Sequence, residues 1–216
     1  MREIYSFADI IIQPNTLVLC DIDDTLLRFE KSLLDCYDDT VETIHSIAET
    51  CNMSNDILES CLIDKDNIMK IALNKYHHHQ LATEPKHNDE TGFQNMIGEI
   101  KRKNSSLAFL TARPKTSDWL TMEHFRVLGI RYDEYVVYYA SSNISKSKYL
   151  LEHLGEMGNY VNVIVIDDKR EILEEIDEDF PNIETYWMTK VLTDYERTKT
   201  KKNTGNPDNK NKEKIE

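Results

Sequence analysis

Residues 17–27, with the sequence Leu-Val-Leu-Cys-Asp-Ile-Asp-Asp-Thr-Leu-Leu, contain the pattern that decides the fold. Four apolar residues run up to Cys20, and carboxylates follow at once at Asp21 and Asp23. Continuous apolar runs of this length are typical of strands that are buried on both faces of a parallel sheet. Because ligands bind beyond the carboxyl ends of strands in open α/β sheets, Asp21 and Asp23 are candidate functional residues.

Four more segments of the chain have the composition of buried strands. Between them, apolar residues recur every three or four positions, so that strand and helix alternate from residue 105 to 188. This alternation predicts a doubly wound, Rossmann-like parallel sheet in an α/β domain. The predicted strands cover residues 17–20, 107–110, 135–139, 163–166 and 183–188.

Residues 29–87 interrupt this alternation, because they hold no strand pattern. Apolar residues step by three or four through 29–51 and predict one amphipathic helix. Shorter patterns at 57–62 and 68–76 predict two more helices. A helical block is therefore expected between the first and second strands of the main sheet.

Composition and charge limit the classes of function. The chain has 216 residues, 40% of them hydrophobic, and a net charge of −13. An acidic body repels nucleic acids and anionic membranes, so neither is expected as a dedicated partner. The longest run of apolar or tyrosine residues, 135–140, is far shorter than the ~20 residues of a membrane-spanning helix. Residues 197–216 carry seven basic and three acidic residues and are expected to be a disordered basic tail, with a basic anchor for an anionic partner as the alternative.

The four cysteines form no CxxC pair, and the N-terminus lacks the apolar stretch of a secretory signal. We therefore expect a reducing, cytoplasmic location. Cys20 is interpreted as a small hydrophobe of a buried strand. The run His77 to His79 is interpreted as a solvated helix end, because adjacent histidines on a helix point about 100° apart and cannot all bind one ion.

A second acidic pair, Asp167 and Asp168, directly follows the apolar run 163–166. Paired carboxylates at a strand end can bind a divalent cation or divide into a nucleophile and a general acid/base. For the first pair, a simple strand-to-loop transition in which Asp24 or Thr25 caps a helix is the alternative. Two acidic strand ends on one sheet favour a hard cation, and we expect Mg²⁺, since crowded carboxylates are otherwise unfavourable.

Two further strand ends suit a phosphoryl group. Thr111 and Ala112 supply a hydroxyl and a closely approaching backbone N–H group after the second strand. Lys146 is expected to begin a helix, where its charge is poorly placed for the helix dipole but well placed for a phosphate; Lys148 is the alternative. Arg113 either contacts a second anion of the substrate or pairs with a surface carboxylate.

Together these motifs resemble those of the haloacid dehalogenase superfamily. DIDDT at 21–25, LTAR at 110–113, Lys146 at a helix start and VIVIDD at 163–168 follow the order of its four motifs. The resemblance covers roughly residues 15–190 and is closest to an uncharacterised branch, a domain family of unknown function. It implies an α/β core of residues 1–28 and 88–196 with the helical cap 29–87 inserted into it.

The resemblance also implies a role for each motif residue. Asp21 would be the nucleophile that forms an aspartyl-phosphate, and Asp23 the general acid and then the general base. The phosphoryl oxygens would be held by Thr111, Lys146 and the backbone N–H groups of Ile22, Asp23 and Ala112. Mg²⁺ would be bound by Asp21, the backbone carbonyl of Asp23 and Asp167, with Asp168 supporting the site indirectly or through water.

The function expected from this set is Mg²⁺-dependent hydrolysis of a small phosphomonoester. One alternative is phosphotransfer to a sugar or nucleotide hydroxyl, and another is a binding protein of the same fold whose catalysis is secondary or lost. The second acid, Asp23, and the pair Asp167 and Asp168 argue against metal-free dehalogenase chemistry. A cap would close over a small substrate and exclude water.

Overall fold

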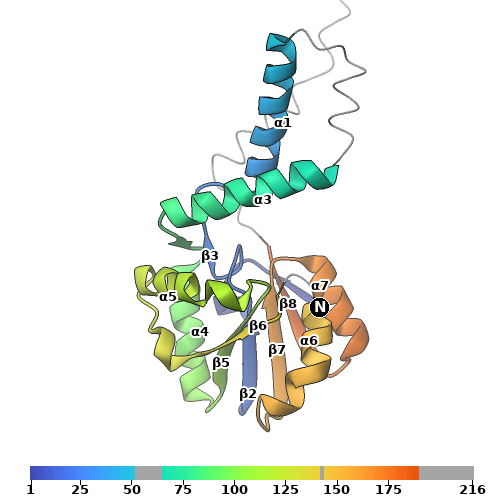
Figure 1. Cartoon of the computed structure of the whole chain (residues 1–216). Helices are drawn as coiled ribbons and strands as arrows, with labels where there is room; N and C mark the ends of the chain where they lie inside the picture. Colours follow the sequence, from blue (N-terminus) through green and yellow to red (C-terminus); the bar gives the residue numbers. More distant parts are fainter. Residues whose placement is uncertain (52–64, 142–143, 190–216) are drawn as a thin grey trace, which may run out of the picture.

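The computed structural model describes residues 1–51, 65–141 and 144–189 (Figure 1). Its centre is a six-stranded sheet with the order β1-β8-β7-β2-β5-β6, in which every neighbouring pair is parallel. All residues of β2 are buried, which fits its place inside the sheet. The doubly wound parallel sheet and its five predicted strands are confirmed, and β1 is added at one edge. The strands are β1 (Arg2–Ile4), β2 (Thr16–Cys20), β5 (Ser106–Thr111), β6 (Val136–Tyr139), β7 (Asn162–Asp167) and β8 (Ile183–Met188).

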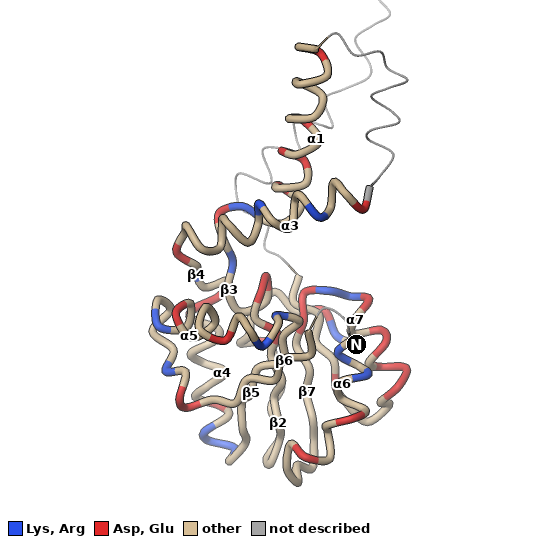
Figure 2. Tube along the Cα trace, viewed as in Figure 1, with Lys and Arg blue, Asp and Glu red and all other residues tan. Residues whose placement is uncertain are grey.

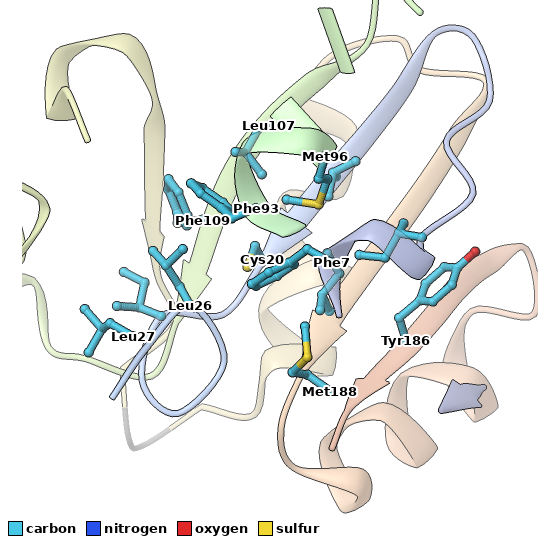
Figure 3. Packing of buried hydrophobic residues seen from close by; sticks show 14 of the residues in the cluster. Phe7, Cys20, Leu26, Leu27, Phe93, Met96, Leu107, Phe109, Tyr186 and Met188 are labelled. Carbon is cyan, nitrogen blue, oxygen red and sulfur yellow. The ribbon is translucent and has the colours of Figure 1, made fainter. Parts of the chain in front are cut away.

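Helices cover both faces of the sheet (Figure 1). On one face, Phe93 of α4 and Phe125 of α5 pack in a large apolar cluster with Phe109 of β5, part of which is drawn in Figure 3. On the other face, Leu150 of α6 and Leu173 of α7 belong to a second cluster. The helices are α4 (Glu90–Arg102), α5 (Asp118–Val127), α6 (Lys146–His153) and α7 (Arg170–Asp179), with 3-10 turns at Phe7–Asp9, Lys115–Ser117, Tyr132–Glu134 and Leu154–Glu156.

A second region lies beyond the carboxyl ends of the strands (Figure 1). It consists of α1 (Leu33–Thr50) and α3 (Lys65–Ala82), connected to the sheet domain through the antiparallel pair β3 (Leu27–Arg28) and β4 (Lys86–His87). The prediction that residues 29–87 hold no strand was therefore wrong at β4. Two residues are too few for a periodic pattern, and the pairing forms only because the chain leaves and re-enters the core at adjacent points.

The first predicted helix also begins later than its apolar spacing suggested. Ser32 caps α1, because its hydroxyl accepts from the backbone N–H of Asp35 while the Asp35 carboxylate accepts from the Ser32 backbone. Phe29 precedes this cap and is buried, with its ring 5.1 Å from that of His124 and 6.2 Å from that of Tyr76. The predicted helix at 57–62 and the predicted basic tail 197–216 lie outside the described residues.

Charged residues lie on the helices and the connecting loops, whereas the central strands carry almost none (Figure 2). Within the described ranges, no helix combines the length and the apolar character that crossing a membrane requires. The acidic residues that follow β2 and β7 are the exception to the surface location of charge, and they mark the candidate site.

Candidate active site

The loop after β2 places Asp21 and Asp23 at the carboxyl end of the sheet. The backbone N–H of Asp21 donates to the carbonyl of Ile166 at 2.9 Å, which continues the pairing with β7. The chain then turns at Asp24, whose φ of 62° lies in the left-handed region. The side-chain amide of Asn88 donates to the carbonyl of Asp24 at 3.0 Å. A turn held in this way fixes the directions in which Asp21 and Asp23 project.

The strand ends bring three carboxylates and one ammonium group together. One carboxylate oxygen from each of Asp21, Asp167 and Asp168 lies within 4.8 Å of the others. Lys146, the first residue of α6, places its Nζ 2.6 Å from Oδ1 of Asp21 and 2.6 Å from Oδ2 of Asp167. These three side chains are almost fully buried, so their interactions are only weakly screened by solvent.

Burial and mutual repulsion make it unfavourable for all three carboxylates of this cluster to be ionised together. Burial, with the neighbouring carboxylates, raises the pKa of Asp21 to about 7, even though Lys146 opposes the shift. The same causes raise the pKa of Asp168 to about 8. Burial also disfavours the charged form of Lys146, but the carboxylates of Asp21 and Asp167 outweigh it and raise the lysine pKa. One ammonium group therefore does not compensate three carboxylates.

A divalent cation is the group that fits this donor set. Hard cations such as Mg²⁺ prefer carboxylate oxygens, and a double charge would relieve the repulsion that raises the pKa values of Asp21 and Asp168. The three carboxylates converge from two adjacent strand ends, as the sequence predicted for them. The residues that could bind the ion are Asp21, Asp167 and Asp168.

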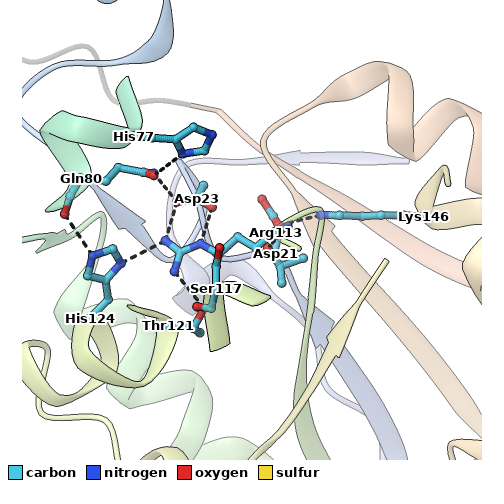
Figure 4. A network of polar contacts seen from close by, with 10 residues as sticks. Asp21, Asp23, His77, Gln80, Arg113, Ser117, Thr121, His124 and Lys146 are labelled. Carbon is cyan, nitrogen blue, oxygen red and sulfur yellow. Dashed lines mark hydrogen bonds and ion pairs between the residues drawn. The ribbon is translucent and has the colours of Figure 1, made fainter. Parts of the chain in front are cut away.

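Asp23 has a different partner, the guanidinium group of Arg113 (Figure 4). Nε of Arg113 donates to Oδ2 of Asp23 and Nη2 donates to Oδ1, both at 2.7 Å. Burial alone would raise the pKa of Asp23, but Arg113 lowers it below its usual value. Arg113 is only 8% exposed. The sequence left open whether it contacts an anion of the substrate or pairs with a surface carboxylate; it pairs with a carboxylate, and that carboxylate belongs to the candidate site.

The candidate phosphate-binding residues lie along the same edge. Thr111 ends β5, next to β2, and its hydroxyl accepts from the backbone N–H of Arg113 at 3.2 Å. Ala112 follows it and is exposed. Of the two candidate lysines, Lys146 reaches the acidic cluster, whereas Lys148 is exposed and contributes its backbone N–H to the cap of α6.

Two residues of this site escaped the sequence analysis. Gln80, in the last turn of α3, donates from Nε2 to Oδ1 of Asp23 at 3.2 Å. His124 of α5 accepts from Nη2 of Arg113 at its Nδ1, and its Nε2 lies 3.3 Å from the backbone oxygen of Gln80. Burial and the charge of Arg113 lower the pKa of His124 to about 4. The available signal was the spacing of Thr121, His124 and Phe125 on one face of α5, all of them buried.

Residues 1–149 match a protein family described as "Protein of unknown function (DUF2608)". The chain belongs to this family. The predicted resemblance to a domain family of unknown function is thus confirmed, and the family's description names no activity. The matched residues include Asp21, Asp23, Thr111 and Lys146, and they end before β7. None of the curated proteins matches the chain.

Several solved structures are similar to the chain in fold. One, described as a beta-phosphoglucomutase from Thermotoga maritima, has 17% identity and a TM-score of 0.48, over 80% of this chain and 84% of that one. A second, described as a haloacid dehalogenase-like hydrolase from Burkholderia xenovorans LB400, has 12% identity and a TM-score of 0.43, over 81% and 84%. A hydrolase from Streptococcus pneumoniae TIGR4 has 11% identity and a TM-score of 0.43, over 88% and 100%.

Proposed function

We propose that this protein is a Mg²⁺-dependent hydrolase of a small phosphomonoester that works through an aspartyl-phosphate on Asp21. The observation that carries the proposal is the convergence of Asp21, Asp167 and Asp168 within 4.8 Å, with Lys146 in contact with two of them. A nucleophile, cation ligands and a fixed positive charge are what phosphoryl transfer requires. Bound Mg²⁺ would supply charge neutralisation for the phosphoryl oxygens.

In the first step, a carboxylate oxygen of Asp21 attacks phosphorus while the bond from phosphorus to the ester oxygen breaks. Asp23 must be protonated for this step, although Arg113 favours its ionised form, and it passes that proton to the departing oxygen, which leaves as an alcohol. In the second step, Asp23 takes a proton from water as the water oxygen attacks the phosphoryl group. The bond between phosphorus and Asp21 then breaks, and phosphate and the free Asp21 carboxylate result.

The remaining residues orient the reaction. The ammonium group of Lys146, the hydroxyl of Thr111 and the backbone N–H groups of Ile22, Asp23 and Ala112 would hold the phosphoryl oxygens. Positioning of this kind accounts for much of the rate of phosphoryl transfer, since the protein performs little covalent chemistry beyond the attack. The ionised form of Asp23 that Arg113 favours suits the second step, in which Asp23 accepts a proton.

The inserted helices α1 and α3 would act as the cap over a small substrate, within domain limits of 29–87 for the cap and of 1–28 with 88–196 for the core. Their position beyond the carboxyl ends of the strands supports this role (Figure 1). We propose a cytoplasmic location, and the free thiols of the described cysteines Cys20, Cys36 and Cys51 support it, since a reducing compartment keeps cysteines in that form.

The test is a panel of phosphorylated metabolites and p-nitrophenyl phosphate, assayed for phosphate release with Mg²⁺ and again with excess chelator. We expect turnover that requires the cation and at least one metabolite preferred over the aryl ester. Phosphate release that survives chelation would contradict the cation site. Release of no phosphate from any ester would contradict the hydrolase itself.

A further inference from the structure

The last turn of α3 contacts the sheet domain through one residue at two points. The backbone oxygen of Gln80 faces Nε2 of His124 at 3.3 Å, and its side-chain amide donates to Asp23 at 3.2 Å. Nδ1 of His124 accepts from Arg113, so the proton of its neutral ring is on Nε2 and is donated to Gln80. Gln80 therefore connects the inserted helices to the carboxylate of Asp23, the proposed general acid and base.

The network leaves the Asp23 carboxylate little freedom. Oδ1 accepts from both Arg113 and Gln80, and Oδ2 accepts from Arg113 (Figure 4). Arg113 is itself fixed by Thr121, whose hydroxyl lies 3.1 Å from Nη1. The Asp23 side chain is 28% exposed, whereas Gln80 is 6% and His124 2% exposed. The Asp23 side chain is thus partly accessible, whereas the groups that contact it are buried.

This arrangement has a consequence for catalysis by Asp23. An oxygen that transfers a proton must be within hydrogen-bond reach of the leaving group and correctly aimed. Arg113 contacts both oxygens of Asp23 and so fixes the plane of the carboxylate. Gln80 adds a second donor to Oδ1, which leaves Oδ2, with a single partner, as the oxygen that can exchange a proton with the leaving group. His77, whose Nδ1 lies 3.3 Å from Oε1 of Gln80, orients the amide so that its NH₂ faces Asp23.

We propose that Gln80 is a positioning residue for Asp23, so that proton transfer to the leaving oxygen requires the last turn of α3 to be seated on the sheet domain. The proposal rests on the proposed hydrolase function. A buried glutamine that merely satisfies its own hydrogen bonds would affect all substrates alike. A positioning residue would instead affect substrates according to how much their leaving groups need a proton.

The first experiment tests the contact without using activity. The sequence contains three glutamines, Gln13, Gln80 and Gln94, so a chain labelled with ¹⁵N-glutamine shows three side-chain NH₂ signals. Asp23→Asn removes the charge to which Gln80 donates, and we expect the Gln80 signal to shift by more than 0.2 ppm in ¹H. The exposed Gln13 and Gln94 are internal controls and should not move. An unmoved Gln80 signal would overturn the proposal.

The second experiment compares leaving groups. Gln80→Met keeps the length of the buried side chain and removes the amide, and Gln94→Met at an exposed position is the matched control. We expect Gln80→Met to lower kcat/KM, which reports the step that releases the leaving group, at least tenfold more for glycerol 2-phosphate than for p-nitrophenyl phosphate, whose leaving group needs no proton. Equal losses for the two esters would show a purely structural role and overturn the proposal.

The two experiments also separate this proposal from the proposed function. If wild-type protein releases phosphate from no ester of the metabolite panel, the hydrolase assignment is wrong, and the positioning role is wrong with it even where the Gln80 signal shifts. If wild-type protein is active and the Gln80 signal does not shift, only the positioning role is wrong. A shifted signal together with a selective loss on glycerol 2-phosphate supports both.

Discussion

At the scale of single residues, two carboxylates only two positions apart have opposite electrostatic surroundings. Asp21 lies with Asp167 and Asp168, and burial raises its pKa to about 7. Asp23 is paired with Arg113, which lowers its pKa despite burial. Two acids whose surroundings separate their pKa values can take different parts in one reaction. Each acid also has its own cationic neighbour, Lys146 for Asp21 and Arg113 for Asp23, and the two cations follow different strands.

Substitution of the proposed nucleophile gives the most direct prediction at this scale. Asp21→Asn should lower kcat for p-nitrophenyl phosphate by at least about 10³-fold, because an amide oxygen is a poor nucleophile and a weaker cation ligand. The measurement is phosphate release at saturating Mg²⁺, with circular dichroism to confirm that the variant is folded. Activity within tenfold of the wild type would exclude Asp21 as the nucleophile.

The raised pKa values of the acidic cluster predict how the stability of the cation-free protein depends on pH. Burial raises the pKa of Asp168 to about 8 and that of Asp21 to about 7, so near neutral pH the folded chain holds protons that the unfolded chain has released. Rising pH therefore favours unfolding through this window. With chelator present, the free energy of unfolding should fall by roughly 3 kcal/mol from pH 6.5 to pH 9.

Urea denaturation at several pH values measures this slope, and Asp168→Asn is the control. An asparagine cannot bind the proton, so the variant should lose clearly less stability across the same window. The same slope in variant and wild type would mean that Asp168 is ionised in the folded, cation-free protein.

At the scale of elements, α5 carries polar residues that hold Arg113 on the same face as the apolar residue that packs on the sheet. The apolar spacing of Trp119, Met122 and Phe125 predicts a buried face, yet Trp119 is 57% and Met122 51% exposed. The buried face instead contains Thr121, His124 and Phe125. Phe125 attaches the helix to the sheet, and the two polar residues on the same face hold Arg113.

Two aromatic residues of α5 should therefore differ sharply in their effect on stability. Phe125 is fully buried, and its ring centroid lies 4.7 Å from that of Phe109, so Phe125→Ala should cost about 3–5 kcal/mol of unfolding free energy. Trp119→Ala should change it by less than about 1 kcal/mol, because the indole is mostly exposed. Urea denaturation of both variants measures the difference. Similar losses would contradict the orientation of the helix.

At the scale of the whole molecule, the inserted helices share the main apolar core. Cys36 of α1, together with Ala72 and Tyr76 of α3, belongs to the same buried cluster as Val18 of β2 and Phe125 of α5. Polar contacts from Gln80 add to this packing. The position of α3 and the geometry of Asp23 at the strand ends therefore depend on each other, because packed side chains and hydrogen bonds connect the two without a gap.

Binding of the cation should stabilise the whole chain. A ligand that binds only the folded protein adds free energy that grows with its concentration, by about 1.4 kcal/mol for each tenfold increase above its dissociation constant. Mg²⁺ should thus raise the melting temperature progressively, whereas NaCl of equal ionic strength should not. Asp167→Asn should remove most of the rise. A melting temperature indifferent to Mg²⁺ would contradict the cation site.

Local sequence patterns determined the sheet and the acidic strand ends. A strand buried on both faces must be apolar throughout, so runs such as 163–166 are visible without knowledge of their neighbours. The carboxylates that end these runs must then meet at one edge, because parallel strands place their carboxyl ends together. Asp21, Asp167 and Asp168 were found in this way, whereas Lys146 was found from its expected place at the start of a helix.

Only the tertiary structure decided how Asp23 is held. Its partner Arg113 is 90 residues away in the chain, and its partner Gln80 is 57 residues away on an inserted helix. No periodicity connects such positions, because periodicity reports which face of an element is buried and not what that face touches. His124 and Gln80 have no local signature of function. Gln80 contacts Asp23, and His124 contacts Arg113, only because α3 and α5 pack against the same strand ends.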